Sequence, residues 1–382
     1  MNRITGTYAI STTLGESVRA FVPHPLPPSN PVLALDSFIE SNRAAELALA
    51  RLGGVSGLVP SVDWLLYSAI RKEALLTSQI EGTQATLTDL FDEEAGLKVS
   101  NTDDIEEVTN YLRAFRLVQD QLRDPEGLPI SVRLLCDAHR LLLDGVRGAG
   151  KQPGELRRSL NWIGGTRPGN AVFVPPPPER VPELLANMER FIHSTSTDLP
   201  PLVKVALVHA QFETIHPFLD GNGRIGRLLI AALFENWGLL SEPLMYLSAY
   251  LKQHQSEYYR RLSGIRTEGD WESWVSFFLE GVATAAADAE RSIIAIASLV
   301  AADRRRLLES PKVGPASYRL FEMLPMMPRF TIERVRQKLD TSFPTANAAV
   351  KTLEELGVVT ELTGQKKNRS YSYQTYIELL TR

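Results

Sequence analysis

A sharp polar turn between two apolar helical runs is the feature that most constrains the fold of this chain. The turn, HPFLDGNGRIGR, spans residues 216–227. Apolar residues recur at three- and four-residue steps before it, in Pro201–Ile215, and after it from Leu228 onward. This spacing predicts a buried helix on each side. A turn between buried helices needs neither a histidine nor two arginines, so these residues indicate a function.

The residues of the turn suit an anion site beside a base. Pro217 cannot continue the preceding helix, so His216 projects from the end of that helix. His216 is the only group of the turn that titrates near neutral pH, as a general base does. Gly221 and Gly223 let backbone N–H groups approach a ligand closely, and the N-terminus of the following helix attracts anions.

Three charged residues extend this interpretation to a polyphosphate. Arg224 and Arg227 are three residues apart, so both can face the same anion. Asp220 fits there when a divalent cation lies between its carboxylate and phosphate oxygens. The turn therefore predicts phosphoanhydride binding with Mg²⁺, although the Walker A pattern is absent from the sequence.

Simpler interpretations remain open for single members of the turn. Asp220-Gly221 and Asn222-Gly223 are ordinary turn dipeptides. His209 and His216 could form a metal pair, although they are seven residues apart with no third ligand nearby.

Helical periodicity dominates the chain and predicts a mainly α protein. The predicted helices are 37–52, 62–81, 104–122, 131–143, 181–194 and 201–215, followed by more helix to about residue 307. Residues 1–32 are rich in Pro, Ser and Thr and are expected to form an extended arm. Around a Pro-Gly-Asn turn, residues 160–164 and 171–174 predict a β-hairpin.

The last seventy residues differ from the rest in pattern and in charge. Short helices over 318–324, 331–340 and 345–356, followed by a hairpin of 358–362 with 370–373, give the order of a winged helix-turn-helix. Residues 310–382 hold 11 Lys and Arg against 7 Asp and Glu, a charge of +4, while the rest of the chain carries -8. The predicted regions are an arm (1–32), an N-terminal helical region (33–130), a core (131–309) and a C-terminal domain (310–382).

Composition excludes several classes of protein. With 41 basic and 45 acidic residues and 44% hydrophobic residues, the chain has no global signature of polyanion binding. Its single cysteine, Cys136, excludes an intramolecular disulfide and fits a reducing compartment. No signal peptide and no apolar run long enough for a bilayer is present, so a cytoplasmic protein without membrane contact is expected.

The turn matches throughout the signature HxFx[D/E]GNGRxxR of the Fic (filamentation-induced-by-cAMP) family, and the resemblance extends beyond it. The segments PLPP, EALLTSQIEGTQATLTDLF and NYLRAF resemble the N-terminal region of Fic proteins that carry their own inhibitory helix. TGQKKNRSYSY resembles the winged-helix tail of the same subgroup. The resemblance implies a Fic-type helical core with a β-hairpin flap, a C-terminal winged-helix domain and a homodimer.

This resemblance implies a protein adenylyltransferase, which transfers AMP from ATP to a Ser, Thr or Tyr hydroxyl of a target protein or of itself. His216 would then take the hydroxyl proton, Asp220 would hold Mg²⁺, and Phe218 would be the buried anchor of the turn. The implied phosphate contacts are Gly221, Asn222, Gly223 and Arg224, with Arg227 at the γ-phosphate.

The hairpin corresponds to the family's flap, which borders the nucleotide and aligns the target by strand addition. Residues at the flap positions that touch nucleotide are Ile163, Gly164, Gly165 and Thr166. A hairpin that only closes the domain is the alternative. For the adenine side we suggest Tyr250, Tyr258 and Tyr259, of which at least one is expected to pack in the core.

TSQIEG, Thr77 to Gly82, matches the family's inhibitory pattern [S/T]xxxE[G/N]. Gly82 is expected to stop the helix, which leaves Glu81 in its last turn, where a carboxylate opposes the helix dipole at a cost of roughly 0.3–1 kcal/mol. The resemblance supplies a cationic partner, Arg227, which Glu81 would hold away from the γ-phosphate of ATP. In some relatives this glutamate also serves to remove AMP, and a solvated helix-end glutamate is the alternative.

Two other functions remain open. Some Fic relatives transfer phosphocholine or phosphate, but the phosphorylating ones depart from the GNGR core that is intact here at residues 221–224. The chain could instead be a nucleotide-sensing transcriptional regulator that binds DNA. Residues 345–356 would then be the recognition helix, and Lys366, Lys367 and Arg369 would contact phosphates.

Overall fold

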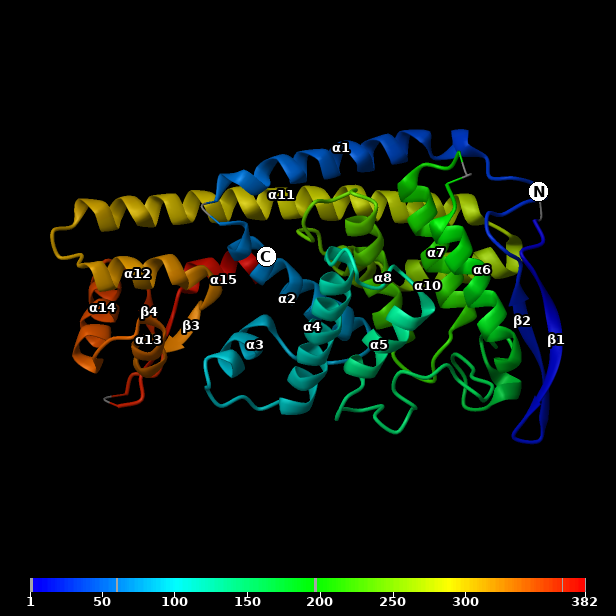
Figure 1. Ribbon diagram of the computed structural model, residues 1–382, viewed down its shortest axis with the longest axis horizontal. Coiled ribbons are helices and arrows are strands. Elements are labelled where there is room, and N and C mark those ends of the chain that lie inside the picture. The colour runs from blue at the N-terminus through cyan, green and yellow to red at the C-terminus, as the bar shows by residue number, and fades with distance from the viewer. Residues whose placement is uncertain (1–2, 60, 196–197, 366, 382) are drawn as a thin grey trace.

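The computed structural model describes residues 3–59, 61–195, 198–365 and 367–381, and it is mainly helical, as the sequence predicts (Figure 1). The first helices are α1 (Ile39–Val55), α2 (Val62–Ile80), α3 (Leu87–Glu94), α4 (Thr102–Arg123), α5 (Val132–Leu142), α6 (Val181–His193), α7 (Pro201–Ile215) and α8 (Asn222–Asn236). They are followed by α9 (Leu247–Gln253), α10 (Gln255–Glu268), α11 (Trp271–Glu309), α12 (Pro315–Met323), α13 (Ile332–Leu339), α14 (Phe343–Glu355) and α15 (Gln374–Thr381). Among the described residues, no helix combines the length and apolarity that crossing a bilayer requires.

The core of the fold surrounds α7. Nearly every residue of α7 is buried, including the apolar residues on all its faces, which is typical of a central helix. It packs against α8, α6 and the 39-residue helix α11. Helix α1 lies along α11 for most of its own length (Figure 1). The polar turn between α7 and α8 therefore starts and ends in the buried core of the molecule.

Most of the arm predicted over residues 1–32 forms a β-hairpin, which was not predicted. Strands β1 (Gly6–Thr13) and β2 (Glu16–Pro23) pair in antiparallel register from Gly6 opposite Pro23 to Thr13 opposite Glu16. Their two-residue turn has positive φ at both Leu14 and Gly15. Leucine rarely adopts that conformation, so residues 14 and 15 do not resemble the usual two-residue hairpin turns.

The predicted hairpin of residues 160–174 is present in reduced form. Its strands form a single antiparallel bridge, between Ile163 and Phe173. The intervening loop contains a short 3₁₀ turn, Pro168–Asn170, in which the Asn170 amide oxygen accepts hydrogen bonds from the N–H groups of Thr166 and Arg167, each at 3.0 Å. The hairpin also continues into the N-terminal arm, because the Phe21 N–H donates to the Val174 carbonyl at 2.9 Å.

The C-terminal region contains the three predicted short helices, α12 to α14, and a small sheet. Strands β3 (Arg329–Thr331), β4 (Thr360–Glu361) and β5 (Ser370–Ser372) are antiparallel and lie in the order β3-β5-β4. Strand β3 and helix α15 were not predicted. The winged-helix assignment of residues 310–382 stays a prediction, and Lys366, one of its proposed phosphate contacts, lies outside the described residues.

Helix α15 joins the C-terminal region to the rest of the molecule. The Tyr376 hydroxyl forms a hydrogen bond of 2.8 Å with Ser68 Oγ on α2. One turn earlier, the Tyr373 hydroxyl donates to Asp303 Oδ2 on α11 at 2.6 Å. Both tyrosines are buried, and the apolar core runs without a break from α2 and α11 into residues 310–382.

Candidate active site

The polar turn contains two residues in the left-handed conformation. His216 ends α7 with φ 50° and ψ 62°, and Gly221 precedes α8 with φ 75°. A left-handed backbone is uncommon for a residue other than glycine, and it ends α7 at His216. No side chain caps the N-terminus of α8, so its first N–H groups are left to point into the site. This is the arrangement that an anion site at a helix N-terminus requires.

Asn222 holds the turn in shape. Its amide oxygen accepts from the Phe218 N–H and its amide nitrogen donates to the Phe218 carbonyl, each at 2.8 Å. Phe218 is buried, as predicted, and stacks on His139 with ring centroids 3.9 Å apart. The Asn222 side chain is thus used within the protein, so only its backbone N–H is left to meet a phosphate.

Two buried residues that the sequence did not single out support the turn from behind. Arg157 donates to the carbonyl of His216 at 2.8 Å and to that of Ile215 at 3.3 Å. His139 Nδ1 accepts from the Gly154 N–H at 2.9 Å, so its Nε2 carries the proton and donates to the Asp220 carbonyl at 3.0 Å. These contacts fix both ends of the loop between His216 and Gly221.

His216 is uncharged at neutral pH in this environment. Burial lowers the pKa of its imidazole to about 4, with a further contribution from the Arg157 guanidinium. Its Nδ1 atom is buried, and no group of the described residues meets the geometry of a hydrogen bond with it. A neutral imidazole has a free lone pair, so His216 can accept a proton without first losing one.

Asp220 is the residue immediately before Gly221, the N-cap of α8. Its Oδ1 accepts from the Gly221 N–H at 2.6 Å, and its side chain is 41% exposed. Within the described ranges no cluster of three His, Cys, Asp or Glu residues could hold a metal ion. Mg²⁺ needs no such cluster, because it is usually bound by one or two carboxylates together with substrate phosphates. Asp220 beside a free helix N-terminus fits this mode of binding.

The two arginines of the turn have different partners, although the sequence suggested a common anion. Arg224 Nη1 donates to Glu107 Oε2 on α4 at 3.1 Å, and its Nη2 is 3.7 Å from Asp220 Oδ1. The side chains of Arg224 and Glu107 are only 3% and 2% exposed. Glu107 therefore supplies the counter-charge of the buried Arg224 guanidinium.

Glu107→Ala is expected to lower the free energy of unfolding by about 3–5 kcal/mol, because it leaves the Arg224 charge buried beside only a distant carboxylate. Chemical denaturation measures this loss. Glu106→Ala is the matched control, since Glu106 is the neighbouring residue of α4 and is exposed. An equal loss in both variants would contradict the role of Glu107.

Arg227 is bound by α2, at the residues that the inhibitory pattern indicates. Its Nη2 donates to Glu81 Oε1 at 2.5 Å, its Nε donates to Thr77 Oγ1 at 2.6 Å, and Nη2 also reaches the Thr77 carbonyl at 3.1 Å. Burial favours the neutral form of Glu81, but the Arg227 guanidinium outweighs it, and the pKa of this carboxyl lies below its usual value. The pair is therefore fully ionised at neutral pH.

The end of α2 lies close against the N-terminus of α8. Gly82 stops the helix with φ 103°, which leaves Glu81 as its C-cap, as predicted. A Cβ atom added to Gly223 would collide with the Glu81 carboxylate and would approach Arg227 Nη1 to 3.0 Å. A side chain at position 223 would therefore displace the paired ends of the Glu81 and Arg227 side chains.

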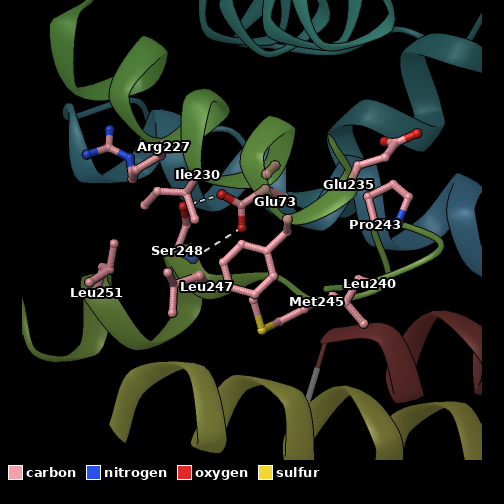
Figure 2. A pocket seen from close by; sticks show the side chains of 12 residues that line it. Glu73, Arg227, Ile230, Glu235, Leu240, Pro243, Met245, Leu247, Ser248 and Leu251 are labelled. Atoms are coloured by element: carbon pink, nitrogen blue, oxygen red, sulfur yellow. Dashed lines mark hydrogen bonds between the residues drawn. The ribbon is translucent and has the colours of Figure 1, made fainter. Parts of the chain in front are cut away.

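Further contacts fix α2 in this position. Figure 2 shows the buried Glu73 carboxylate of α2 bound by Ser248, whose N–H donates at 3.1 Å and whose hydroxyl also donates. Near the end of the helix, Lys252 Nζ donates to Gln79 Oε1 at 2.7 Å, and Gln255 Nε2 donates to the Ile80 carbonyl at 3.1 Å. Residues of α9 and the first residue of α10 therefore hold α2 in place.

The flap lies beside the turn. Asn161 Nδ2 is 3.4 Å from the carbonyls of both Phe218 and Leu219, which joins the base of the flap to the motif. Ile163 is 36% exposed, and Gly164 and Gly165 follow it with φ of 67° and 72°. Thr166 forms hydrogen bonds with Asn170 through both its N–H and its hydroxyl.

The three tyrosines suggested for adenine lie in different environments. Tyr258 is 1% exposed, and its hydroxyl lies 2.8 Å from His209 Nε2, so it belongs to the core. His209 Nδ1 lies 3.1 Å from the Gly226 carbonyl, which occupies its second nitrogen and leaves none for a metal pair with His216. Tyr250 is 7% exposed and packs on Phe277, whereas Tyr259 is 47% exposed. Of the three, Tyr259 is the one accessible to a ligand.

The fold and this site identify the family. Residues 39–120 match the N-terminal region of the Fic/DOC family, and residues 129–234 match the Fic/DOC family itself. The chain belongs to the Fic/DOC family over these two regions.

Curated relatives include proteins named protein adenylyltransferase Fic. The one from Drosophila ananassae is 29% identical over 211 residues, which cover 53% of this chain and 38% of that protein. The one from Drosophila melanogaster is 29% identical over 208 residues with the same coverage. The matched region thus spans a little over a third of the length of these relatives.

Solved structures show the same fold. A Fic family protein from Desulfovibrio desulfuricans superimposes with a TM-score of 0.57 at 21% identity, over 91% of this chain and 98% of that one. Residues 134–508 of Fic-1 from C. elegans give a TM-score of 0.51 at 22% identity, over 68% and 73% of the two chains. The likeness to the bacterial protein covers most of the chain, including much of the region outside the two matched segments.

Proposed function

We propose that this protein transfers AMP from ATP to a hydroxyl group of a protein, its own included. The observation that carries the proposal is the position of a neutral His216 beside an uncapped helix N-terminus, with Asp220 and Arg224 next to it. A proton acceptor and an anion site in one loop are what attack of a hydroxyl on a nucleotide phosphate requires. The adenylyltransferase names of the Drosophila relatives support the same reaction.

In the proposed reaction the target hydroxyl oxygen bonds to the α-phosphorus of ATP, the bond to the β-phosphate oxygen breaks, and pyrophosphate leaves. His216 takes the hydroxyl proton at its neutral imidazole. The N–H groups at the start of α8, with Arg224 behind them, bind the phosphates. Asp220 would hold Mg²⁺, which supplies positive charge to the phosphates when bound. Most of the acceleration then comes from positioning and charge.

We further propose that the protein is autoinhibited by its own α2. Arg227 is committed to Glu81 and Thr77, so its guanidinium is not free to bind a γ-phosphate. ATP bound without that contact would keep its α-phosphate in a pose unfit for attack. Glu81 also lies close enough to the anion site to serve in the removal of AMP, as the family resemblance implies.

Incubation of the purified protein with ATP and Mg²⁺ is expected to add one AMP to a hydroxyl side chain, because the site combines a base with a nucleotide phosphate site. Intact-mass and peptide mass spectrometry measure this addition and locate the modified residue. A mass gain of a phosphate or of another group would instead support one of the other Fic transfers. No modification of wild type or of a Glu81→Gly variant would contradict nucleotide transfer to self.

The DNA-binding regulator, the homodimer and the cytoplasmic location stay predictions. The proposed recognition helix corresponds to α14, where Lys351 Nζ lies 3.9 Å from Glu355 Oε1. Arg369 is within 3.5 Å of Asn347 on the same helix.

A further inference from the structure

A cavity separate from the polar turn lies between the N-terminal helices and the C-terminal region. It has a volume of about 720 Å³ and is bordered by α2, α3 and α4 on one side and by the segment from α12 to α13 on the other. A volume of this size is typical of sites for small organic ligands. We call it the interdomain cleft, defined by Tyr67, Arg71, Phe91, Glu94, Arg116 and Glu322 together with residues 323, 326–329, 334 and 338.

The charges of the interdomain cleft are strongly unbalanced. Five cationic side chains line it, against the carboxylates of Glu94 and Glu322. Both carboxylates already have a partner, since Arg71 Nη2 is 2.6 Å from Glu94 Oε1 and Arg304 Nη2 is 2.7 Å from Glu322 Oε1. The acids of the lining therefore neutralise none of the other cations.

Among the described residues, three of the five cations have no counter-charge within ion-pair distance. Arg329 is 3.4 Å from Asp92, which lies behind the wall of the cleft. For Arg116 on α4, and for Arg334 and Lys338 on α13, the described residues offer no ion pair and no side-chain hydrogen bond. Two elements distant in sequence thus bring like charges to one cavity, which disfavours folding slightly unless an anion is bound between them.

The rest of the lining is apolar and adaptable. Met323, Met326 and Met327 lie together at the end of α12, and Met326 is 46% exposed. On the opposite side Tyr67 stacks on Phe91 with ring centroids 6.1 Å apart, and Phe91 itself is buried. Methionine side chains are polarisable and adapt to flat ligand surfaces. The cleft therefore offers positive charge for an anion and an apolar wall for a ring.

We propose that the interdomain cleft binds a small polyanion that carries an aromatic ring, with the chemistry of a nucleoside polyphosphate. Arg116, Arg334 and Lys338 bind its phosphate charges, and the methionines cover its ring. This site shares no residue with the turn of residues 216–227, so the inference does not depend on AMP transfer.

The test is calorimetric titration of the full chain with ATP, which counts the bound molecules. Wild type is expected to bind one more ATP than the double variant Arg116→Ala/Lys338→Ala. Both substituted side chains are exposed, so the variant is expected to fold. The matched control is Arg43→Ala/Arg305→Ala, which removes two exposed, unpaired cations from α1 and α11 and should bind as many ATP molecules as wild type.

The difference between variants separates this site from the active site. If the turn also binds ATP, wild type and the control variant bind two ATP molecules and the cleft variant binds one. If the turn does not bind ATP, wild type and the control bind one ATP molecule and the cleft variant binds none. Equal counts for wild type and the cleft variant overturn the proposal. Inorganic triphosphate is the second probe, and it is expected to bind the cleft more weakly than ATP; equal affinity overturns the role of the apolar wall.

Discussion

Glu81→Gly is expected to raise self-labelling with AMP by roughly ten- to a hundredfold. The substitution removes a charge-assisted hydrogen bond to Arg227, and such a bond contributes about 1.5–3 kcal/mol. Each 1.4 kcal/mol corresponds to about a factor of ten in the rate of labelling. The gain follows if this hydrogen bond is what holds Arg227 away from ATP in the wild type. Incorporation of radiolabelled AMP from ATP, measured at equal protein concentrations, gives the ratio.

The double variant Glu81→Gly/Arg227→Ala is expected to lose this gain, because the freed arginine is what binds the γ-phosphate. Glu126→Gly is the matched control, since Glu126 is an exposed loop glutamate for which the described residues show no ion pair. Equal labelling of wild type and Glu81→Gly would refute inhibition by α2. Labelling that survives loss of Arg227 would show that α2 acts through a different residue.

Replacement of His216 is expected to reduce AMP transfer by roughly a hundredfold to ten-thousandfold, the usual contribution of a general base. ATP binding should persist, because its contacts come from the start of α8 and from Arg224. His216→Asn is preferred to His216→Ala, since asparagine tolerates the left-handed backbone at φ 50° better than alanine does. Both are made in the Glu81→Gly background, where the rate is high enough to measure.

Transfer at the rate of the Glu81→Gly parent in both His216 variants would show that the base is elsewhere. The pH profile gives a second check. His216 must be neutral to act, and its pKa is about 4, so the rate should not fall through protonation of this residue until the pH approaches that value. A loss of activity centred near 6.5, the usual histidine pKa, would contradict the buried environment of His216.

The parts of the site that are local in sequence could be predicted from the sequence. The left-handed Gly221, the uncapped start of α8 and the helix stop at Gly82 all follow from the residue types at those positions. The contact between Glu81 and Arg227 spans 146 residues and was found only through the family's inhibitory pattern.

Contacts between distant residues with no such pattern were missed. Glu107 is 117 residues from Arg224, and Arg157 is 59 residues from His216. Nothing in a helix such as α4 distinguishes a buried glutamate from an exposed one beyond its place on the apolar face. Glu107 does lie on that face, between Ile105 and Val108, and this position was the available signal.

The hydrogen bonds of Tyr376 on α15 and of Tyr373 just before it have a consequence for the cooperativity of unfolding. Because Tyr376 joins α2 at Ser68 and Tyr373 joins α11 at Asp303, residues 310–382 cannot open without exposing buried parts of both helices. The helix that restrains Arg227 and the C-terminal region should then exchange their amide hydrogens as one unit, with a shared free energy of opening. A change that loosens the packing of the C-terminal region would therefore affect Glu81 through α2. It would not need to change the turn of residues 216–227.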